Sequence, residues 1–217
     1  MRMIFRSLLA VSLLAGTLTT AAHAATPLGE FAEAWAKIND YTSNVKVHET
    51  DDGRTEDRRY AYAFKKPHMA RTDIIEGPGK GGGAVWLGGD KVKGHQGGLL
   101  SGIHLTVDIK DKRATSLRGD TIDTGTFGAI LDSFKSTKGE LSEGPGPLIE
   151  GTATEAITLK VATPASNGNI SRDQLFISKA THLPVRRIRY EGDKIVKDET
   201  FSNVKVNPGL SGADFPY

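Results

Sequence analysis

The sequence predicts a mainly β fold of the α+β class, in which one antiparallel sheet carries two helices. Three observations predict it. Apolar residues alternate with polar residues through most of the chain, which is typical of strands. The gaps between these stretches are short and rich in glycine, asparagine and aspartate, which favours hairpins and antiparallel neighbours. Only two stretches carry apolar residues at helical spacing.

The first 24 residues have the features of a secretory signal peptide. Arg2 and Arg6 form a basic start, and the apolar stretch that follows is shorter than the about 20 residues that a membrane span needs. Ala22-His23-Ala24 has the small-x-small pattern of a cleavage site. We expect cleavage after Ala24 and a periplasmic protein, with residues 25–217 as a single domain.

Composition narrows the classes of function. Of the 217 residues, 28 are lysine or arginine and 26 are aspartate or glutamate. The leader holds two of the arginines and no acid, so the mature chain balances 26 basic residues against 26 acidic ones. A net charge of zero gives no support for nucleic-acid binding. The chain has no cysteine, which excludes disulfides and thiol chemistry and leaves a core or sheet to stabilise the domain.

The elements follow in order. Helical spacing of Leu28, Phe31, Trp35 and Ile38 predicts a first helix near the mature start. About nine or ten short strands are then expected. They centre on VKVHE (45–49), RRYAYAFKKP (58–67), RTDII (71–75), GAVWL (83–87), IHLTVDIK (103–110), AITLKVAT (156–163), QLFIS (174–178), VRRIRY (185–190) and FSNVKV (201–206). A second helix is predicted in TFGAILDSFKS (126–136), and EGPGP (143–147) is expected to be a loop.

One glycine-rich stretch, Glu76–Gly98, contains the spacing G-x-G-x-x-G at Gly77, Gly79 and Gly82. A dinucleotide fingerprint needs a helix after these glycines, because the helix N-terminus binds the pyrophosphate. Here GAVWLGGDKV follows, which has the pattern of strand, turn and strand. We therefore expect a flexible hairpin loop without a nucleotide.

An acidic-histidine cluster is formed by His48, Glu49, Asp51 and Asp52. A metal-dependent hydrolase would need such ligands to converge on one point. The Asp52-Gly53 turn favours a solvated hairpin end instead. We therefore expect no metal, no cofactor and no enzymatic activity.

Two other polar motifs have structural interpretations. His95 and His104 lie on strands that are expected to pair, so their side chains can approach each other, but two ligands are too few for a zinc site. Arg118-Gly119-Asp120 spells an adhesion tripeptide and is expected to be an ordinary turn.

The sheet has an apolar face that must be covered, and only two helices are available to cover it. Either the interior is fully packed, or it contains a groove or cavity for an apolar ligand. Arg186, Arg187 and Arg189 alternate between the two faces of their strand and are expected to be sheet-surface charge. The candidate lining of a cavity is the set of inward apolar residues: Tyr60, Tyr62, Phe64, Trp86, Ile103, Leu105, Val107, Ile157, Leu159, Phe127, Ile130 and Phe134.

Four stretches, which together span most of the mature chain, carry a resemblance to a known family. They are YAFKKPHMARTDI (62–74), AVWLGGDKVKGH (84–95), TPASNGNISRDQLFISKATHLPVRRIRYEGDKI (163–195) and TFSNVKVNPGL (200–210) with Ala213-Asp214-Phe215. In this order they resemble the strand–proline corner–strand, the hairpin, the late meander and the closing strand of the LolA-like group of exported carriers, which includes LolA and RseB.

The resemblance implies an unclosed antiparallel β-barrel wrapped over a few helices, with an apolar cavity between them. It implies a non-catalytic periplasmic carrier or chaperone for lipid or acyl-chain cargo, lipoproteins included, working as a monomer with a membrane-protein donor or acceptor. The alternative is an envelope sensory module of the RseB type that binds lipid or protein. In such carriers the glycine-rich hairpin lies beside the cavity mouth, where the resemblance implies mobility as its task.

The resemblance also suggests a latch. In LolA an arginine directly before the corner proline bonds to the backbone of the covering helix and holds the cavity shut. The matching residue is Lys66, before Pro67. A lysine has three donors on a flexible stem where arginine has five in a rigid fork, so a lysine latch should be weaker. Lys66 is either this latch or a plain surface charge.

Overall fold

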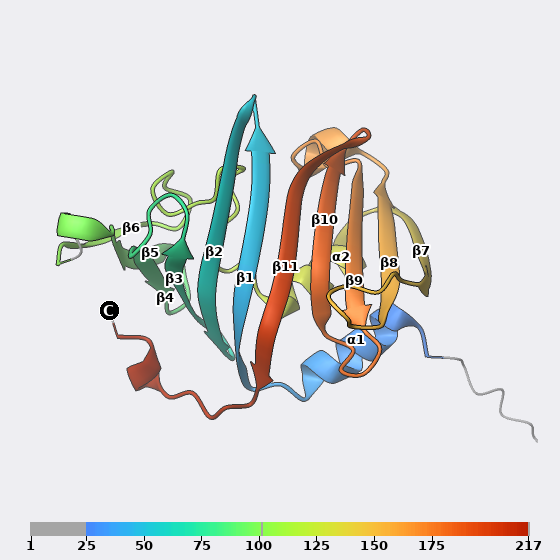
Figure 1. The fold of residues 1–217 in the computed structure, drawn as a ribbon, viewed down its shortest axis with the longest axis horizontal. Helices are drawn as coiled ribbons and strands as arrows, with labels where there is room; N and C mark the ends of the chain where they lie inside the picture. Colours follow the sequence, from blue (N-terminus) through green and yellow to red (C-terminus); the bar gives the residue numbers. More distant parts are fainter. Residues whose placement is uncertain (1–24, 101, 217) are drawn as a thin grey trace, which may run out of the picture.

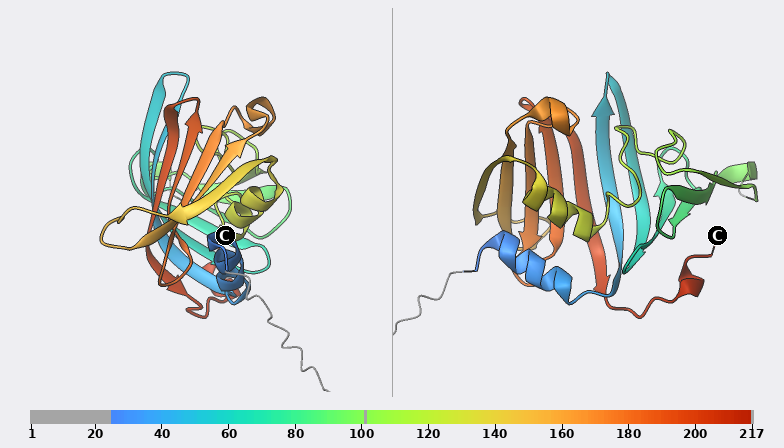
Figure 2. Two further views of the ribbon diagram at one scale, coloured as in Figure 1. Left: turned by 90° about the vertical axis from the view of Figure 1, so that its right-hand side faces the viewer. Right: turned by 180° about the vertical axis from the view of Figure 1, so that it is seen from behind.

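The structure is a computed structural model that describes residues 25–100 and 102–216. The predicted signal peptide, residues 1–24, lies outside the described residues. The described chain forms one sheet with two α-helices on one of its faces, behind the sheet in Figure 1 and in front of it in the reverse view of Figure 2. The predicted mainly β fold is confirmed. Among the described helices, none has the length and apolar character that a membrane crossing requires.

Both predicted helices are present. α1 spans Pro27–Ala36 and α2 spans Phe127–Ser136. Each begins after a threonine, Thr26 or Thr126, whose hydroxyl accepts a hydrogen bond from the amide three residues on, at 3.2 Å and 2.9 Å. These caps satisfy backbone groups that a helix start leaves unpaired. The apolar stripe of α2 is buried, as its spacing predicts.

The sheet has eleven described strands in the order β6-β5-β4-β3-β2-β1-β11-β10-β9-β8-β7. All neighbours are antiparallel. The strands are β1 (Asp40–Asp51), β2 (Arg54–Lys65), β3 (Met69–Glu76), β4 (Gly83–Trp86), β5 (Lys91–His95), β6 (His104–Asp108), β7 (Gly139–Pro145), β8 (Thr154–Val161), β9 (Arg172–Ser178), β10 (Pro184–Glu191) and β11 (Lys194–Val206). β6 and β7 are the edges, so the sheet does not close, as expected for an unclosed barrel. β1 and β11 pair in its middle.

The turns follow the predicted chemistry. Asp52 and Gly53, between β1 and β2, both have positive φ, at 46° and 78°. This conformation suits the twist of a tight hairpin and favours aspartate followed by glycine. The long β1–β2 hairpin is therefore determined locally by two residues.

The glycine-rich stretch is a pair of hairpins, as predicted, without the helix that a dinucleotide site needs. Its loops pack closely. A Cβ on Gly77 would lie 2.1 Å from the carbonyl oxygen of Asp57, and one on Gly97 would lie 1.9 Å from that of Lys80. Glycine is needed here because backbones come into direct contact.

β7 was not expected from the sequence. The stretch Glu143–Pro147, which is expected to be a loop, contributes its first three residues to this strand. Glycine, proline and, to a lesser degree, glutamate have low strand propensity, so the local pattern does not reveal the strand. β7 lies at the edge of the sheet, where a proline such as Pro145 is tolerated. With β7 the described sheet has eleven strands, more than the nine or ten expected.

The core lies between the two helices and the concave face of the sheet. Tyr41 of β1 stacks on Phe127 of α2, with ring centroids 4.3 Å apart and an interplanar angle of 5°. Its hydroxyl accepts a hydrogen bond from the Phe127 amide at 3.2 Å, and burial raises the pKa of Tyr41. Trp35 of α1 packs against Phe64 of β2 at 5.6 Å. These aromatic contacts join both helices to the middle of the sheet.

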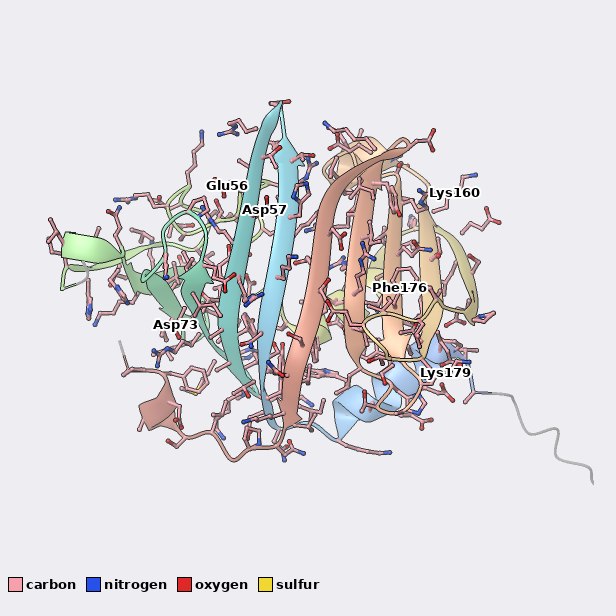
Figure 3. All side chains as sticks on the ribbon, in the orientation of Figure 1. Glu56, Asp57, Asp73, Lys160, Phe176 and Lys179 are labelled. Atoms are coloured by element: carbon pink, nitrogen blue, oxygen red, sulfur yellow. The ribbon has the colours of Figure 1, made fainter. Side chains whose placement is uncertain are left out.

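A smaller cluster lies on the convex face. Phe176 of β9 packs with Ile188 of β10 and with Ile149, which belongs to the β7–β8 connection that crosses this face (Figure 3). Leu175 and Ile177 of the same strand are buried on the concave face. β9 is therefore apolar on both faces because both are covered, unlike a half-exposed strand.

Candidate functional site

A cavity of about 400 Å³ lies on the concave face of the sheet and is partly open to solvent. Its cover is α2 together with residues 109–126, which connect β6 to α2 and are called here the cover connection. The volume is within the range of about 300–1,000 Å³ that is usual for ligand pockets. Its apolar wall comes from five strands and α2: Val45, Val47, Tyr60, Tyr62, Ile74, Ala84, Ile130 and Phe201.

Toward the β1–β2 turn the same concave face becomes charged. Along β11, for example, the inward residues change from Phe201 to Glu199 and Lys197. Lys197 lies opposite Glu49 on one side and Arg189 on the other. The charged side chains of this region are called here the charged band: Glu49, Glu56, Arg58, Asp173, Arg187, Arg189, Lys197 and Glu199.

Ion pairs across neighbouring strands compensate these buried charges. The Nζ of Lys197 lies 2.7 Å from Glu49 and 3.3 Å from Glu199. The Nε of Arg187 donates to Asp173 at 3.0 Å, and the two side chains are only 8% and 3% exposed. Burial by itself lowers the pKa of Lys197, but Glu199 and its neighbouring carboxylates outweigh it and raise the pKa above its ordinary value. The lysine therefore stays charged inside the fold.

The cover connection is anchored to the charged band. Asp120 accepts a hydrogen bond from the Nζ of Lys197 at 2.6 Å and pairs with Arg189. The hydroxyl of Ser116 donates to Glu49 at 3.0 Å. Burial by itself raises the pKa of Asp120, but Lys197 and Arg189 together hold it well below the usual range. Charged groups of the sheet thus hold the cover over the cavity.

Three polar motifs lie elsewhere than predicted. Glu49 is not part of a solvated turn, because it is 3% exposed and paired. Arg118 and Asp120 do not form an ordinary surface turn, because both side chains bond to the sheet. The arginines of β10 do split over two faces, but Arg187 and Arg189 lie on the covered face and are not surface charge. The alternation of residues along a strand shows that successive side chains point to opposite faces of the sheet. Only the tertiary structure shows which of the two faces is covered.

The predicted lining residues are divided among several places. Three line the central cavity: Tyr60, Tyr62 and Ile130. Three line a second pocket of about 200 Å³ beside β5 and β6: Ile103, Leu105 and Val107. Ile103 and Leu105 are 55% and 47% exposed, because their edge of the sheet extends beyond the helices (Figure 2). They therefore line the smaller pocket at the edge of the sheet and not the central cavity.

The other predicted lining residues do not line the cavity. Five are in the packed core, where the helices press against the sheet: Phe64, Phe127, Phe134, Ile157 and Leu159. Trp86 is half-buried at the end of β4, where its indole nitrogen donates to the carbonyl of Gly89 at 2.8 Å. Both alternatives left open by the sequence are thus present, a packed core over one part of the sheet and a cavity over another.

Among the described residues, two groups carry donors of the kind that metals bind. His95 and His104 approach as predicted, with ring centroids 5.4 Å apart. Glu30 of α1, Glu155 of β8 and His182 of the β9–β10 turn have ligand atoms within 4.8 Å of one another. The Nδ1 of His182 lies 3.1 Å from Glu30, so this turn and α1 are neighbours. Neither group includes a residue of the predicted cluster around His48.

Lys66 makes the backbone contact that the resemblance suggests, but with α1, which does not line the cavity and packs through Trp35 against Gly128 of the covering helix α2. Its Nζ donates to the backbone carbonyl of Trp35, in the last turn of α1, at 2.8 Å. The same ammonium lies 4.3 Å from the centre of the Trp35 ring, where a cation is attracted to the aromatic face. Burial lowers the pKa of Lys66. The amide of Ile38 also bonds to this carbonyl, so the lysine supplies one of two hydrogen bonds.

We expect Lys66→Leu to speed ligand exchange and Lys66→Arg to slow it. Each effect should be at most about 1 kcal/mol, or about fivefold in rate, because one hydrogen bond changes while a second remains. Stopped-flow exchange of a fluorescent fatty acid measures both. Lys65→Leu is the matched control, since Lys65 donates to the carbonyl of Leu210 in the tail and not to α1. Equal rates in all variants would reduce Lys66 to a surface charge.

No protein-family model matches the sequence, and a search of curated proteins finds no match. Solved structures do match. A conserved protein from Thermus thermophilus aligns with a TM-score of 0.55 and 12% identity, over 88% of this chain and 91% of its own. MucB aligns with a TM-score of 0.51 and 12% identity, over 88% of this chain and 61% of its own. A LolA superfamily protein from Nitrosomonas europaea aligns with a TM-score of 0.40 and 10% identity, over 88% and 98%.

The likeness is one of fold. The first two matches show that other proteins share this arrangement of an unclosed sheet over helices. At these identities the matches describe the backbone, and the function has to be argued from the cavity.

Proposed function

We propose that the protein is a non-catalytic periplasmic carrier or chaperone that holds a lipid or acyl chain in the central cavity. The observation that carries the proposal is the cavity of about 400 Å³ under a cover, with an apolar wall from the sheet and α2. An acyl chain that buries about ten methylenes there gains about 8 kcal/mol by leaving water. Such a carrier needs no chemical step. The cargo is released when a downstream site binds it with a lower free energy.

The partners in this proposal are a membrane-protein donor or acceptor and an acylated cargo, lipoproteins included. The protein acts as a monomer and binds no nucleic acid, in agreement with its balanced charge. A sensory module of the RseB type would use the same cavity. Native mass spectrometry of protein taken directly from the periplasm separates the two, since a carrier arrives with lipid and a sensor with a membrane-protein partner.

Filling the cavity should abolish uptake. Ala129 of α2 lines the cavity, so Ala129→Trp places an indole in the space of the chain. We expect at least tenfold weaker binding of Nile red and of a fluorescent fatty acid, with the helix content unchanged. Ser136→Trp is the matched control, because Ser136 is exposed on the same helix. If the Ala129 variant binds both probes as tightly as the wild type does, the cavity is not the binding site.

A further inference from the structure

The central cavity has two unlike walls, which a purely apolar ligand would not need. Its lining includes five basic residues, four of them from the charged band and Arg113 from the cover connection: Arg58, Arg113, Arg187, Arg189 and Lys197. It presents only two acidic ones, Asp120 and Glu199. Other acids of the band contact these bases without lining the cavity: Glu49, Glu56 and Asp173. The charged residues that line the cavity are therefore richer in hydrogen-bond donors and positive charge than the charged band as a whole.

Two of the basic residues have a donor to spare. The Nε of Arg58 and the Nε of Arg189 are buried and have no hydrogen-bond acceptor among the described residues. The remaining nitrogens of each guanidinium are in use. Arg58 pairs with Glu56 at 2.8 Å, and Arg189 donates from Nη1 to Asp120 at 3.1 Å. A buried N–H without an acceptor is unfavourable and rare in native structures, so such a group on a cavity wall points to an acceptor from a ligand.

The position of these donors defines the kind of head that fits. Arg58 lies on β2 and Arg189 on β10, with β1 and β11 between them. Neighbouring strands are about 4.8 Å apart, so the backbones of β2 and β10 are about 14 Å apart, and the side chains of Arg58 and Arg189 both line the cavity between them. Between them and the helices lies the apolar wall. An amphiphile therefore fits with its chain on the apolar wall and its polar head on the band.

Taking the proposed function as the basis, we infer that the cargo is an acyl ligand whose head carries acceptor oxygens, as a carboxylate or an ester carbonyl does. The spare Nε–H groups of Arg58 and Arg189 donate hydrogen bonds to these oxygens. A cationic head is rejected, because it would meet the basic side of the ion pairs in surroundings that screen charge poorly. The charged band thus distinguishes acyl ligands by their heads, whereas the apolar wall contacts only their chains.

Three probes with the same chain length test the inference: palmitic acid, methyl palmitate and hexadecylamine. Displacement of Nile red from the full protein gives their affinities. We expect the acid and the ester to bind at least tenfold more tightly than the amine. The variant Arg58→Lys with Arg189→Lys keeps both positive charges but loses the spare donors, and we expect the preference to fall below threefold. Arg58→Lys alone is the second variant, in case the double change lowers stability.

Arg186→Lys is the matched control. Arg186 is on the same strand as Arg189, faces the opposite side and is paired with Asp198. It should keep the full preference for acid and ester. Equal affinity of the three probes in the wild type would overturn the role of the head and leave the carrier proposal standing. A preference that survives in both lysine variants would overturn the assignment to Arg58 and Arg189. Binding of no probe at all would overturn the proposed function itself.

Discussion

Ile157→Asp will unfold the protein, whereas the same substitution at Leu105 will leave the fold intact. Ile157 of β8 is 0% exposed and belongs to the main core, while Leu105 of β6 is 47% exposed beside the second pocket. An isolated carboxylate in an apolar core costs more than the about 5–15 kcal/mol by which a domain is stable. At Leu105 water reaches the new charge, so the cost is small.

Circular dichroism and thermal unfolding of the two variants measure this difference. Ile157→Val is the control for the site itself, since it removes one methyl group and should cost about 0.5–1.5 kcal/mol. A folded Ile157→Asp protein with the melting temperature of the wild type would mean that water reaches β8, and that the cavity extends over the region described above as packed.

Arg187→Met will cost about 3–5 kcal/mol of unfolding free energy, because it leaves the buried carboxylate of Asp173 without its partner. Arg187 also lies 3.5 Å from the hydroxyl of Ser133 on α2, so the change loosens the cover. The neighbouring Arg186 forms a similar pair with Asp198, but on the convex face and with 36% and 23% exposure. Arg186→Met should therefore cost about 1 kcal/mol or less.

Urea unfolding of both variants gives the comparison. The double variant Arg187→Met with Asp173→Leu should recover most of the loss, because no unpaired charge remains inside the fold. In a chain of this size a loss of about 4 kcal/mol lowers the melting temperature by about 10 °C. Equal losses of unfolding free energy in the Arg186 and Arg187 variants would show that the charged band is solvated, and that its charges are stable there without a paired side chain.

Local patterns were sufficient for most of the secondary structure. The helix α2 is amphipathic over its whole length, and the β1–β2 turn needs two adjacent residues with positive φ. Both signals are contained in a few neighbouring residues. β7 escaped prediction because its stability comes from pairing with β8 at the edge of the sheet, while its own residues have weak strand propensity.

Less of the candidate site than of the fold could be predicted from the sequence. Tyr60, Tyr62 and Ile130 were predicted to line a cavity and do so, since alternation places them on the concave face. The same alternation placed Ile157 and Leu105 on that face, and one is in the packed core while the other is half-exposed. Period-two spacing gives the face of a strand, but the cover above each point depends on where helices from elsewhere in the chain come to lie.

By itself, the sequence determined the fold class, the two helices, the hairpin turns and the inward direction of the apolar residues, because these depend on spacing and on the backbone preferences of single residues. Only the tertiary structure decided that the concave face is part core and part cavity, and that the cavity has a charged side. Asp120 and Lys197 are 77 residues apart in the chain and 2.6 Å apart in the fold. A buried charge is stable only where the fold places an oppositely charged side chain beside it. When that partner comes from a distant segment, the local spacing of residues does not reveal it.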